Sequence, residues 1–415
     1  MGEWSALFVR LFIAGQILVS SAVVLYAMLT LASAIVSLRR EVRPRGLDAR
    51  FRRYAEGGGP LVTVMVPCRN EASVVRSTLR SVATQSYPNI EIIAIDDNSS
   101  DGTADQIELA ISDSPGADIR LVRRAYPNSN KARALNDALR YARGEIVAFF
   151  DADYILDRDC VGWLVARIET TQAGAVQGRV RLAQTRGPIN RAVALERLAG
   201  FDVRMRAKSR VGLNTQFGGT VGAVRRSTLD KLGGFEVSSL TEDTDLTVRI
   251  ILAGQRVVFE PCAIGYEQAP PDLRNYVRQK SRWAQGHMRV CLDHWSGVLR
   301  SNRLSFKDRF DTLVFLGYYF VHFLPLMVLA FAGVSYAYFG GVRFYSILLV
   351  VGLSLPFSEF GAGIVIQRRW REAYFLPVML FFYILNMAGI YWAMLRLLTG
   401  RDDWLKTGRA SVARS

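Results

Sequence analysis

The sequence predicts a chain in two parts, an α/β domain in its middle and α-helical transmembrane segments toward both of its ends. Half of the 415 residues are hydrophobic, and they are unevenly distributed, with the longest uncharged apolar runs toward the two ends. Between residues 60 and 270, short β-branched runs alternate with helical patterns, which is typical of an α/β domain. The formal net charge of +15 comes from Lys and Arg that gather beside the apolar segments, which indicates a lipid bilayer and no nucleic acid as the partner.

Residues 1–45 are predicted to form a membrane anchor and a basic linker. Residues 11–38 contain no charged side chain, and this run exceeds the roughly 20 residues that a helix needs to cross a bilayer. Four arginines follow between residues 39 and 45, so this end of the helix is expected in the cytoplasm and the anchor is expected to be retained. The Arg-rich stretch to Arg53 and the sequence Gly-Gly-Gly-Pro at 57–60 mark the boundary to the α/β domain.

Four strands are predicted in the first half of the α/β domain, at residues 62–67, 90–95, 119–122 and 147–150. The first, second and fourth end in polar residues, which are 68–71, 96–103 and the pair Asp151 and Asp153. Open α/β sheets bind ligands at the carboxyl edge of their strands, so these polar groups are expected to share one ligand site.

Asp151 and Asp153 are spaced one residue apart at the end of an apolar run. Carboxylate oxygens suit a hard cation such as Mg²⁺ or Mn²⁺, which takes its remaining ligands from substrate phosphates. A predicted helix begins near Asn130 and would present Lys131 to an anion, because helix N-termini favour phosphate. Together these residues indicate a nucleotide diphosphate.

The second half of the α/β domain contains a further strand at 174–180, a helical stretch at 191–209 and a glycine-containing loop at 217–223. The glycines of this loop would let the backbone approach a flat ligand closely. A helix running to Ala253 is expected to begin after Thr241, which is a suitable N-cap.

Residues 271–310 are rich in Arg and carry apolar residues at helical spacing, which predicts amphipathic helices at the membrane interface. Residues 311–398 contain three apolar stretches that are long enough to cross the bilayer, at 312–342, 344–366 and 374–395. The basic loop 367–371 is then expected in the cytoplasm. Three spans put the basic tail, residues 399–415, outside, so either one segment is re-entrant or the positive-inside rule fails here.

Several other polar residues are given no catalytic role. The four cysteines are scattered without C-x-x-C spacing, which predicts reduced cytosolic thiols and no zinc site. Surface or capping roles are expected for Asp157, Asp159 and Asp245, and no metal partner is evident for His287 or His294. For Glu359, which interrupts an apolar segment, a tyrosine or a backbone group is the expected partner.

Five motifs, in this order and at these distances, resemble glycosyltransferase family 2, specifically its membrane-embedded branch with cellulose, chitin-oligosaccharide, hyaluronan and poly-N-acetylglucosamine synthases. They are Val-Pro-Cys-Arg-Asn-Glu at 66–71, Asp-Asp-Asn-Ser-Ser-Asp-Gly-Thr at 96–103, Asp-Ala-Asp at 151–153, Thr-Glu-Asp at 241–243 and Gln-Lys-Ser-Arg-Trp at 279–283. The resemblance implies a cytosolic GT-A (Rossmann-like) domain over residues 60–270.

The resemblance also implies a role for each motif residue. Asp243 would be the catalytic base and Asp153 the ligand of Mg²⁺ or Mn²⁺. The nucleotide sugar would contact Pro67, Asn70, Glu71, Asp96, Asp97, Lys131, Asp151 and Arg282. The acceptor would contact Phe217, Gly218, Gly219, Thr220, Glu242, Gln279 and Trp283. The family usually has Gly before the lysine, whereas this chain has Asn130.

The activity implied is that of an inverting β-glycosyltransferase, with a UDP-sugar donor carrying glucose or N-acetylglucosamine. The leading expectation is a growing polysaccharide as acceptor, with extension coupled to translocation across the membrane. One alternative is a single transfer to a lipid such as ceramide, diacylglycerol or a polyprenyl phosphate; another is a non-catalytic assembly or translocation subunit. The expected location is the plasma membrane, multi-pass, with a cytoplasmic catalytic domain, and an accessory subunit is compatible with this scheme.

Overall fold

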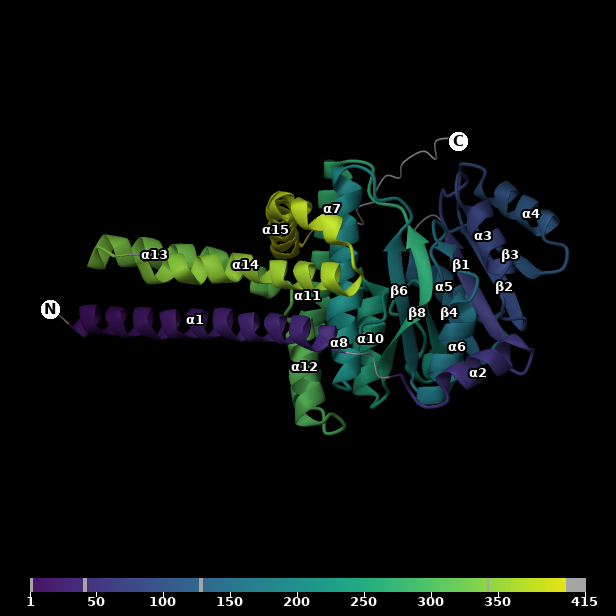
Figure 1. Ribbon diagram of the computed structural model, residues 1–415, viewed down its shortest axis with the longest axis horizontal. Coiled ribbons are helices and arrows are strands. Elements are labelled where there is room, and N and C mark those ends of the chain that lie inside the picture. Colours follow the sequence, from purple (N-terminus) through teal and green to yellow (C-terminus); the bar gives the residue numbers. More distant parts are fainter. Residues whose placement is uncertain (1–2, 40–42, 127–129, 342, 401–415) are drawn as a thin grey trace.

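The computed structural model describes residues 3–39, 43–126, 130–341 and 343–400. Figure 1 shows a layered α/β domain on one side and long helices that project from it on the other, with the N-terminus at the far end of the projection. Arg40 of the predicted linker and residues 401–415 of the predicted basic tail lie outside the described residues.

The α/β domain is built on one mixed sheet of eight strands. Four neighbouring strands are parallel, in the spatial order β3 (Asp118–Arg124), β2 (Ile90–Asp97), β1 (Val62–Cys68) and β4 (Ile146–Phe149). The sheet continues with β7 (Gly222–Arg225), β6 (Ala175–Leu182), β8 (Val257–Glu267) and the short β5 (Ile155–Leu156). Because β7 runs antiparallel to β4, the residues before β7 return to the carboxyl end of β4.

Both faces of the sheet are covered by helices, which explains the continuous apolar runs of its central strands. In β1, Val64 and Val66 face a core that includes residues of α3 (Val75–Ala83), α4 (Thr103–Asp113) and α6 (Cys160–Thr171). Met65, between them, faces the opposite core, with residues of α5 (Lys131–Leu139), α9 (Arg226–Leu232) and α10 (Glu242–Leu252). The predicted strands and their polar carboxyl ends are confirmed.

A short helix that the sequence analysis does not predict, α2 (Leu47–Ala55), precedes the Gly-Gly-Gly-Pro stretch. Its Phe51 ring stacks on Trp163 of α6, with 3.9 Å between ring centroids and 2° between ring planes. Leu47 and Tyr54 are buried in the same core. The basic segment that leaves the membrane anchor is therefore fastened to the α/β domain.

The helical stretch predicted at 191–209 is present as three consecutive helical segments, the middle one of which is not α-helical. It consists of α7 (Pro188–Arg197), the π-helix η1 (Leu198–Met205) and α8 (Arg206–Arg210). A π-helix widens the turn and redirects side chains, and such segments are frequent at functional sites.

In the part of the chain that the structure describes, four segments are apolar enough and long enough to cross a membrane, namely Leu7–Leu38, Phe320–Tyr338, Ile347–Ile366 and Trp370–Leu398. The helices that contain the first three, α1 (Glu3–Leu38), α13 (Leu324–Phe339) and α14 (Arg343–Ile366), run side by side in Figure 1. Val19, Val23, Val328 and Leu348 pack together between them. The predicted stretch 312–342 is divided, because its first residues end α12 (Phe306–Leu316) and η2 (Phe320–Phe323) precedes α13.

The helix α15 (Leu376–Leu398), preceded by η3 (Trp370–Phe375), takes a different direction. Figure 1 shows it nearly end-on, whereas α1, α13 and α14 are seen from the side. It packs along α11 (Leu273–Arg300), where the rings of Phe382 and Tyr276 are 5.6 Å apart between centroids. Further along, Arg396 Nε donates a hydrogen bond of 3.0 Å to Gln285 Oε1.

Candidate active site

A cavity of about 1110 Å³ opens at the carboxyl edge of the parallel strands and extends to the membrane helices. Six of the residues predicted to bind the nucleotide sugar line it: Pro67, Glu71, Asp97, Lys131, Asp151 and Arg282. The predicted base Asp243 also lines it, together with Gly218, Thr220, Glu242, Gln279 and Trp283 of the predicted acceptor site. The structure thus brings together residues that are up to 216 positions apart in the sequence, from Pro67 to Trp283.

Asn70 and Asp96 are not among the residues that line the cavity. The Asn70 Oδ1 accepts a hydrogen bond of 2.8 Å from the backbone N–H of Ser100, and Asp96 Oδ1 accepts one of 3.3 Å from that of Ser99. Both side chains therefore hold the loop that follows β2. Both are contacts within the protein, so the binding roles of Asn70 and Asp96 stay predictions.

Asp97, at the end of β2, is buried and forms an ion pair with Arg124. Arg124 ends the neighbouring strand β3, and its Nη2 also lies 2.6 Å from a carboxylate oxygen of Asp137 on α5. Two carboxylates thus share one guanidinium, which fixes Asp97 at the cavity wall. Arg124 is not predicted from the sequence as a site residue, although its position at the end of a strand could have indicated such a role.

The ammonium group of Lys131 lies among oxygen atoms of the cavity wall. Its Nζ lies 2.6 Å from Asp151 Oδ1, 3.2 Å from the Gly219 carbonyl oxygen and 3.5 Å from Glu242 Oε1. Burial opposes its charge, but the carboxylates of Asp151 and Glu242 raise the pKa of Lys131 above its ordinary value. The N-cap of its helix is Asn130, whose Oδ1 accepts a 2.9 Å hydrogen bond from Arg133 N–H, so the departure from the family's glycine preserves the helix start.

The carboxylates of Asp151 and Asp153 supply only oxygen ligands, as a hard divalent cation prefers. Within the described residues, no group of three or more His, Cys, Asp or Glu side chains is gathered as a complete metal site. This donor set fits Mg²⁺ or Mn²⁺ only if phosphate oxygens or water complete the coordination. Asp151 lines the cavity, whereas Asp153 is half-buried beside it.

The loop before β7 carries one predicted acceptor residue that has another role. Phe217 is fully buried, and its ring packs edge-on against Phe149 of β4 with 5.9 Å between centroids. Its side chain lies in the core beside the sheet and does not line the cavity. The acceptor contact of Phe217 stays a prediction, and the structure does not bring its side chain to the site.

The next residues of this loop do reach the site. Gly219, which has φ 69°, supports Lys131 through its carbonyl oxygen and lies against Asp243 but is not among the lining residues. The Thr220 Oγ1 accepts a 3.0 Å hydrogen bond from the backbone N–H of Asp151. The loop therefore connects the Asp-x-Asp turn to the first turn of α10.

Asp243 occupies the first turn of α10 and faces the cavity. Its Oδ1 accepts a 2.6 Å hydrogen bond from the N–H of Thr244. Burial, and next the charge of Glu242, raise the pKa of Asp243 to about 7, although Lys131 acts in the opposite direction. A carboxylate with a pKa near the working pH is suited to accept a proton. Thr241 stands at the N-cap position, but its side chain makes no capping hydrogen bond.

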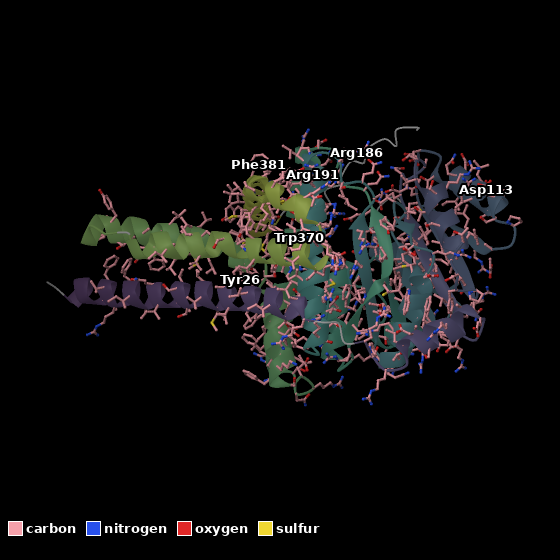
Figure 2. All side chains as sticks on the ribbon, viewed as in Figure 1. Tyr26, Asp113, Arg186, Arg191, Trp370 and Phe381 are labelled. Carbon is pink, nitrogen blue, oxygen red and sulfur yellow. The ribbon has the colours of Figure 1, made fainter. Side chains whose placement is uncertain are left out.

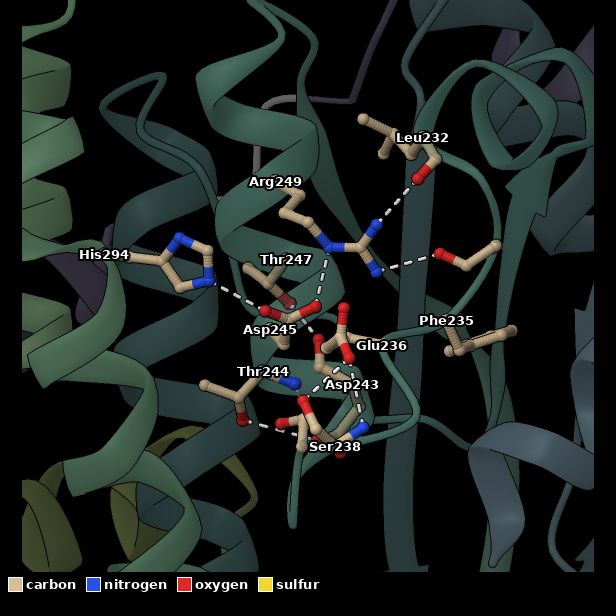
Figure 3. A network of polar contacts seen from close by, with 12 residues as sticks. Leu232, Phe235, Glu236, Ser238, Asp243, Thr244, Asp245, Thr247, Arg249 and His294 are labelled. Atoms are coloured by element: carbon tan, nitrogen blue, oxygen red, sulfur yellow. Dashed lines mark hydrogen bonds and ion pairs between the residues drawn. The ribbon is translucent and has the colours of Figure 1, made fainter.

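Asp245, two residues further, has a structural role (Figure 3). It is buried, and not exposed as predicted, with 2.7 Å between its Oδ1 and His294 Nε2 and 2.6 Å between its Oδ2 and Arg249 Nε. The His294 contact fastens α10 to α11, and both contacts lower the pKa of Asp245 in spite of its burial. The first turn of α10 therefore carries both Asp243, which faces the cavity, and Asp245, which holds this turn against α11.

The Gln-x-x-Arg-Trp motif lies on α11 along another wall of the cavity. Burial lowers the pKa of Arg282, while the charges of Glu242, Asp151 and Asp243 oppose this effect. Two cations lie over the Trp283 ring, with Arg197 Cζ at 5.2 Å and Lys280 Nζ at 5.0 Å from its centroid. This arrangement offers a guanidinium to phosphate oxygens and an aromatic ring to a sugar.

His287, one turn beyond Trp283, also lines the cavity. Its Nε2 lies 2.9 Å from Thr244 Oγ1, and burial lowers its pKa to about 4, so the ring is neutral. No role is predicted for His287 from the sequence, because the residues that it contacts come from distant segments of the chain. Glu359 also differs from expectation, since its partner is Arg204, at 3.7 Å between Oε2 and Nη1.

Known proteins align with most of this chain. A beta-monoglucosyldiacylglycerol synthase of Trichormus variabilis is 29% identical over 341 residues, covering 80% of this chain and 69% of that protein. A poly-beta-1,6-N-acetyl-D-glucosamine synthase of Staphylococcus epidermidis is 24% identical over 370 residues, covering 85% of this chain and 88% of that protein.

A solved structure shares the fold. The mannosyltransferase of Pyrobaculum calidifontis, in complex with GDP-Man and Mn²⁺, superposes with a TM-score of 0.66 at 24% identity and covers 95% of this chain and 99% of that one. The fold is accordingly the predicted GT-A type. Residues 59–286, more than half of the chain, match the family described as Glycosyltransferase like family 2. The chain therefore belongs to glycosyltransferase family 2 and is a glycosyltransferase.

Proposed function

We propose that this protein transfers a sugar from a UDP-sugar to a hydroxyl group of an acceptor at the membrane, with inversion at the anomeric carbon. The observation that carries the proposal is the shared cavity of Asp97, Lys131, Asp151, Arg282 and Asp243. Asp97 would accept hydrogen bonds from the uracil or ribose, and Arg282 and Lys131 would bind the diphosphate. Asp243 would take the proton of the acceptor hydroxyl as its oxygen attacks the anomeric carbon.

A divalent cation would be held by Asp153, with Asp151 beside it, and would neutralise the departing diphosphate. The mannosyltransferase of similar fold was solved with Mn²⁺, which supports Mn²⁺ or Mg²⁺ as the ion here. Lys131 would hold Asp151 in place from the opposite side, since its Nζ is 2.6 Å from Asp151 Oδ1.

Between the two acceptor classes, the packing of the membrane helices favours a lipid over a polysaccharide. Val19, Val23, Val328, Tyr345 and Leu348 fill the space between α1, α13 and α14. A polymer that crossed the membrane through this chain would need a lumen there. The cavity instead reaches the bilayer along α1 and α14, where a membrane lipid would enter from the side.

A growing polysaccharide is the second candidate, because a relative over most of the chain is named as a poly-N-acetylglucosamine synthase. A second copy or an accessory subunit would then have to complete the conduit. For either acceptor we propose a plasma-membrane location with the α/β domain in the cytoplasm, where nucleotide sugars are available.

The deciding experiment uses the purified full-length protein in lipid with Mn²⁺ or Mg²⁺ and radiolabelled UDP-glucose or UDP-N-acetylglucosamine, one donor at a time. A single labelled product in the lipid phase would support the glycolipid function. A long product that polysaccharide-degrading enzymes digest would establish the second candidate. The absence of transfer from every nucleotide sugar to any acceptor would contradict both.

A further inference from the structure

The cavity has a second polar region on its membrane side, which we call the membrane-side cluster and define as Arg204, Tyr318 and Glu359. Arg204 comes from η1, Tyr318 from the segment after α12 and Glu359 from α14, and all three line the cavity. Arg204 Nη1 donates a hydrogen bond of 2.9 Å to Tyr318 Oη. The cluster therefore connects the α/β domain to a helix of the membrane bundle.

Glu359 lies in an otherwise apolar helix, and its side chain is only 8% exposed. Carboxylates are expensive in such surroundings and are usually paired or functional. Its Oε2 lies 3.7 Å from Arg204 Nη1, which is an ion-pair distance but too long for a hydrogen bond. No hydrogen bond of the Glu359 carboxylate to another side chain or backbone group is found within the described residues, so the carboxylate retains its capacity to accept one.

Arg204 is presented to the cavity by the π-helix. Its side chain is 36% exposed, and its guanidinium lies over the Tyr318 ring at 5.1 Å from the centroid. Tyr26, from α1, lines the same part of the cavity, and Figure 2 shows it between α1 and α14. Donors, acceptors and aromatic rings from four segments thus surround one space.

The charges around this space are balanced. One turn after Arg204, Lys208 Nζ lies 2.9 Å from a carboxylate oxygen of Asp311, and both of these side chains also line the cavity. Arg204 and Lys208 are therefore each matched by a carboxylate, and a phosphate would have to compete with Glu359 and Asp311 for these two cations. Hydroxyl groups both donate and accept hydrogen bonds, so they match this mixture of groups.

The walls beside the cluster are apolar. Leu29 and Val36 of α1 and Phe360 of α14 line the cavity on its membrane side. Beyond them, the interior of the bundle is filled by apolar side chains such as Val23 and Leu348. A ligand with a polar head and an apolar chain fits a cavity whose polar cluster is followed by apolar walls.

We propose that the membrane-side cluster binds the uncharged, hydroxyl-bearing head of the lipid acceptor and discriminates against lipids with a phosphate head. This inference rests on the proposed function, because it concerns the acceptor of the same reaction. Arg204 and Tyr318 donate hydrogen bonds to the head group, and Glu359 accepts one. The cluster thereby holds the part of the lipid that surrounds the attacking hydroxyl.

The test is photo-crosslinking of the full-length protein in phosphatidylcholine nanodiscs, with a photoreactive diacylglycerol and, separately, a photoreactive phosphatidic acid at equal mole fraction. Diacylglycerol is expected to label residues that line the membrane side of the cavity and to label them more strongly than phosphatidic acid does. Tyr318→Phe should lower this yield about fivefold, which corresponds to loss of one hydrogen bond. Glu359→Gln should also lower it, though less, because the amide oxygen still accepts a hydrogen bond but is a weaker acceptor than a carboxylate.

Glu372→Gln is the matched control, because Glu372 pairs with Arg369 at 3.1 Å outside the cavity lining. Mn²⁺-dependent UDP binding reports whether each variant is folded, and Tyr318→Phe decides the matter if Glu359→Gln fails this check. Unchanged yield in the cluster variants, stronger labelling by phosphatidic acid, or no diacylglycerol label in the cavity would overturn the proposal. Asp243→Asn should retain the label and lose transfer, and full transfer by this variant would refute only the base role of Asp243. A diacylglycerol label in a wild-type protein that transfers no sugar from any nucleotide sugar would refute the proposed function and leave the binding proposal standing.

Discussion

Gly219 and Asp243 are in direct contact, although they come from different segments of the chain. A Cβ atom at residue 219 would lie 3.0 Å from the Asp243 Cβ and 3.2 Å from its Oδ2. The glycine also has a left-handed backbone conformation, with φ 69°. A side chain at residue 219 would therefore press on Asp243, and the glycine leaves the room that this carboxylate occupies.

The first prediction follows from this contact. Gly219→Ala should lower kcat at least about tenfold, because the new methyl group displaces the Asp243 carboxylate. Gly233→Ala is the control, since Gly233 has φ 73° and no atom within 4 Å of an added Cβ. Both variants should lose about 1–2 kcal/mol of stability through the backbone conformation, measured by thermal unfolding. Equal activity of the two would mean that the contact has no catalytic role.

The second prediction concerns the base itself. Asp243→Asn keeps the shape and the hydrogen bond from Thr244 but cannot accept a proton, so transfer should fall by about 10²–10⁴-fold. Affinity for UDP, measured by calorimetry with Mn²⁺ present, should stay within about twofold, because Asp243 acts on the acceptor. An equal loss of UDP affinity would place Asp243 at the donor instead.

The third prediction concerns pH. Since the pKa of Asp243 is raised to about 7 and the base acts when deprotonated, kcat/KM should fall as pH drops below about 7. Glu242 raises this pKa, so Glu242→Gln should move the acid limb to lower pH. Lys131 lowers it, so Lys131→Gln should move the limb to higher pH. Shifts in the opposite directions would show that another group controls the limb.

The fourth prediction concerns the cation. Asp153→Ala should weaken UDP binding in the presence of Mn²⁺ and leave metal-free binding unchanged, because the ion links this carboxylate to the diphosphate. Asp159→Ala is a suitable comparison, since Asp159 accepts a 2.6 Å hydrogen bond from Ser86 and does not line the cavity. Titrations of UDP with and without EDTA measure the difference. The same metal dependence in wild type and Asp153→Ala would remove Asp153 from the metal site.

The strand pattern predicted much of the site because parallel strands carry their polar ends to one edge. Asp97, Asp151 and Lys131 could therefore be placed together from the sequence. The burial of Phe217 could not be read from the sequence, since it lies in the loop before β7 and its ring packs on Phe149, a residue 68 positions earlier in the chain. Arg124 was missed because its partners Asp97 and Asp137 become neighbours only when β3 joins the sheet.

The direction in which a helix packs is also not contained in the local sequence pattern. Hydropathy identified an apolar helix at the end of the chain, but not that it packs along α11. Glu359 and Arg204 are 155 residues apart, so their pairing was likewise invisible in the sequence.

The direction of α15 bears on how many times the chain would pass through the bilayer. If α1, α13 and α14 are the passages, α15 would lie along the membrane surface beside α11, and the number of passages would be odd. Leu398 would then be on the face that carries the α/β domain. The positive-inside rule expects basic segments on the cytoplasmic face, so this arrangement would need no exception to the rule.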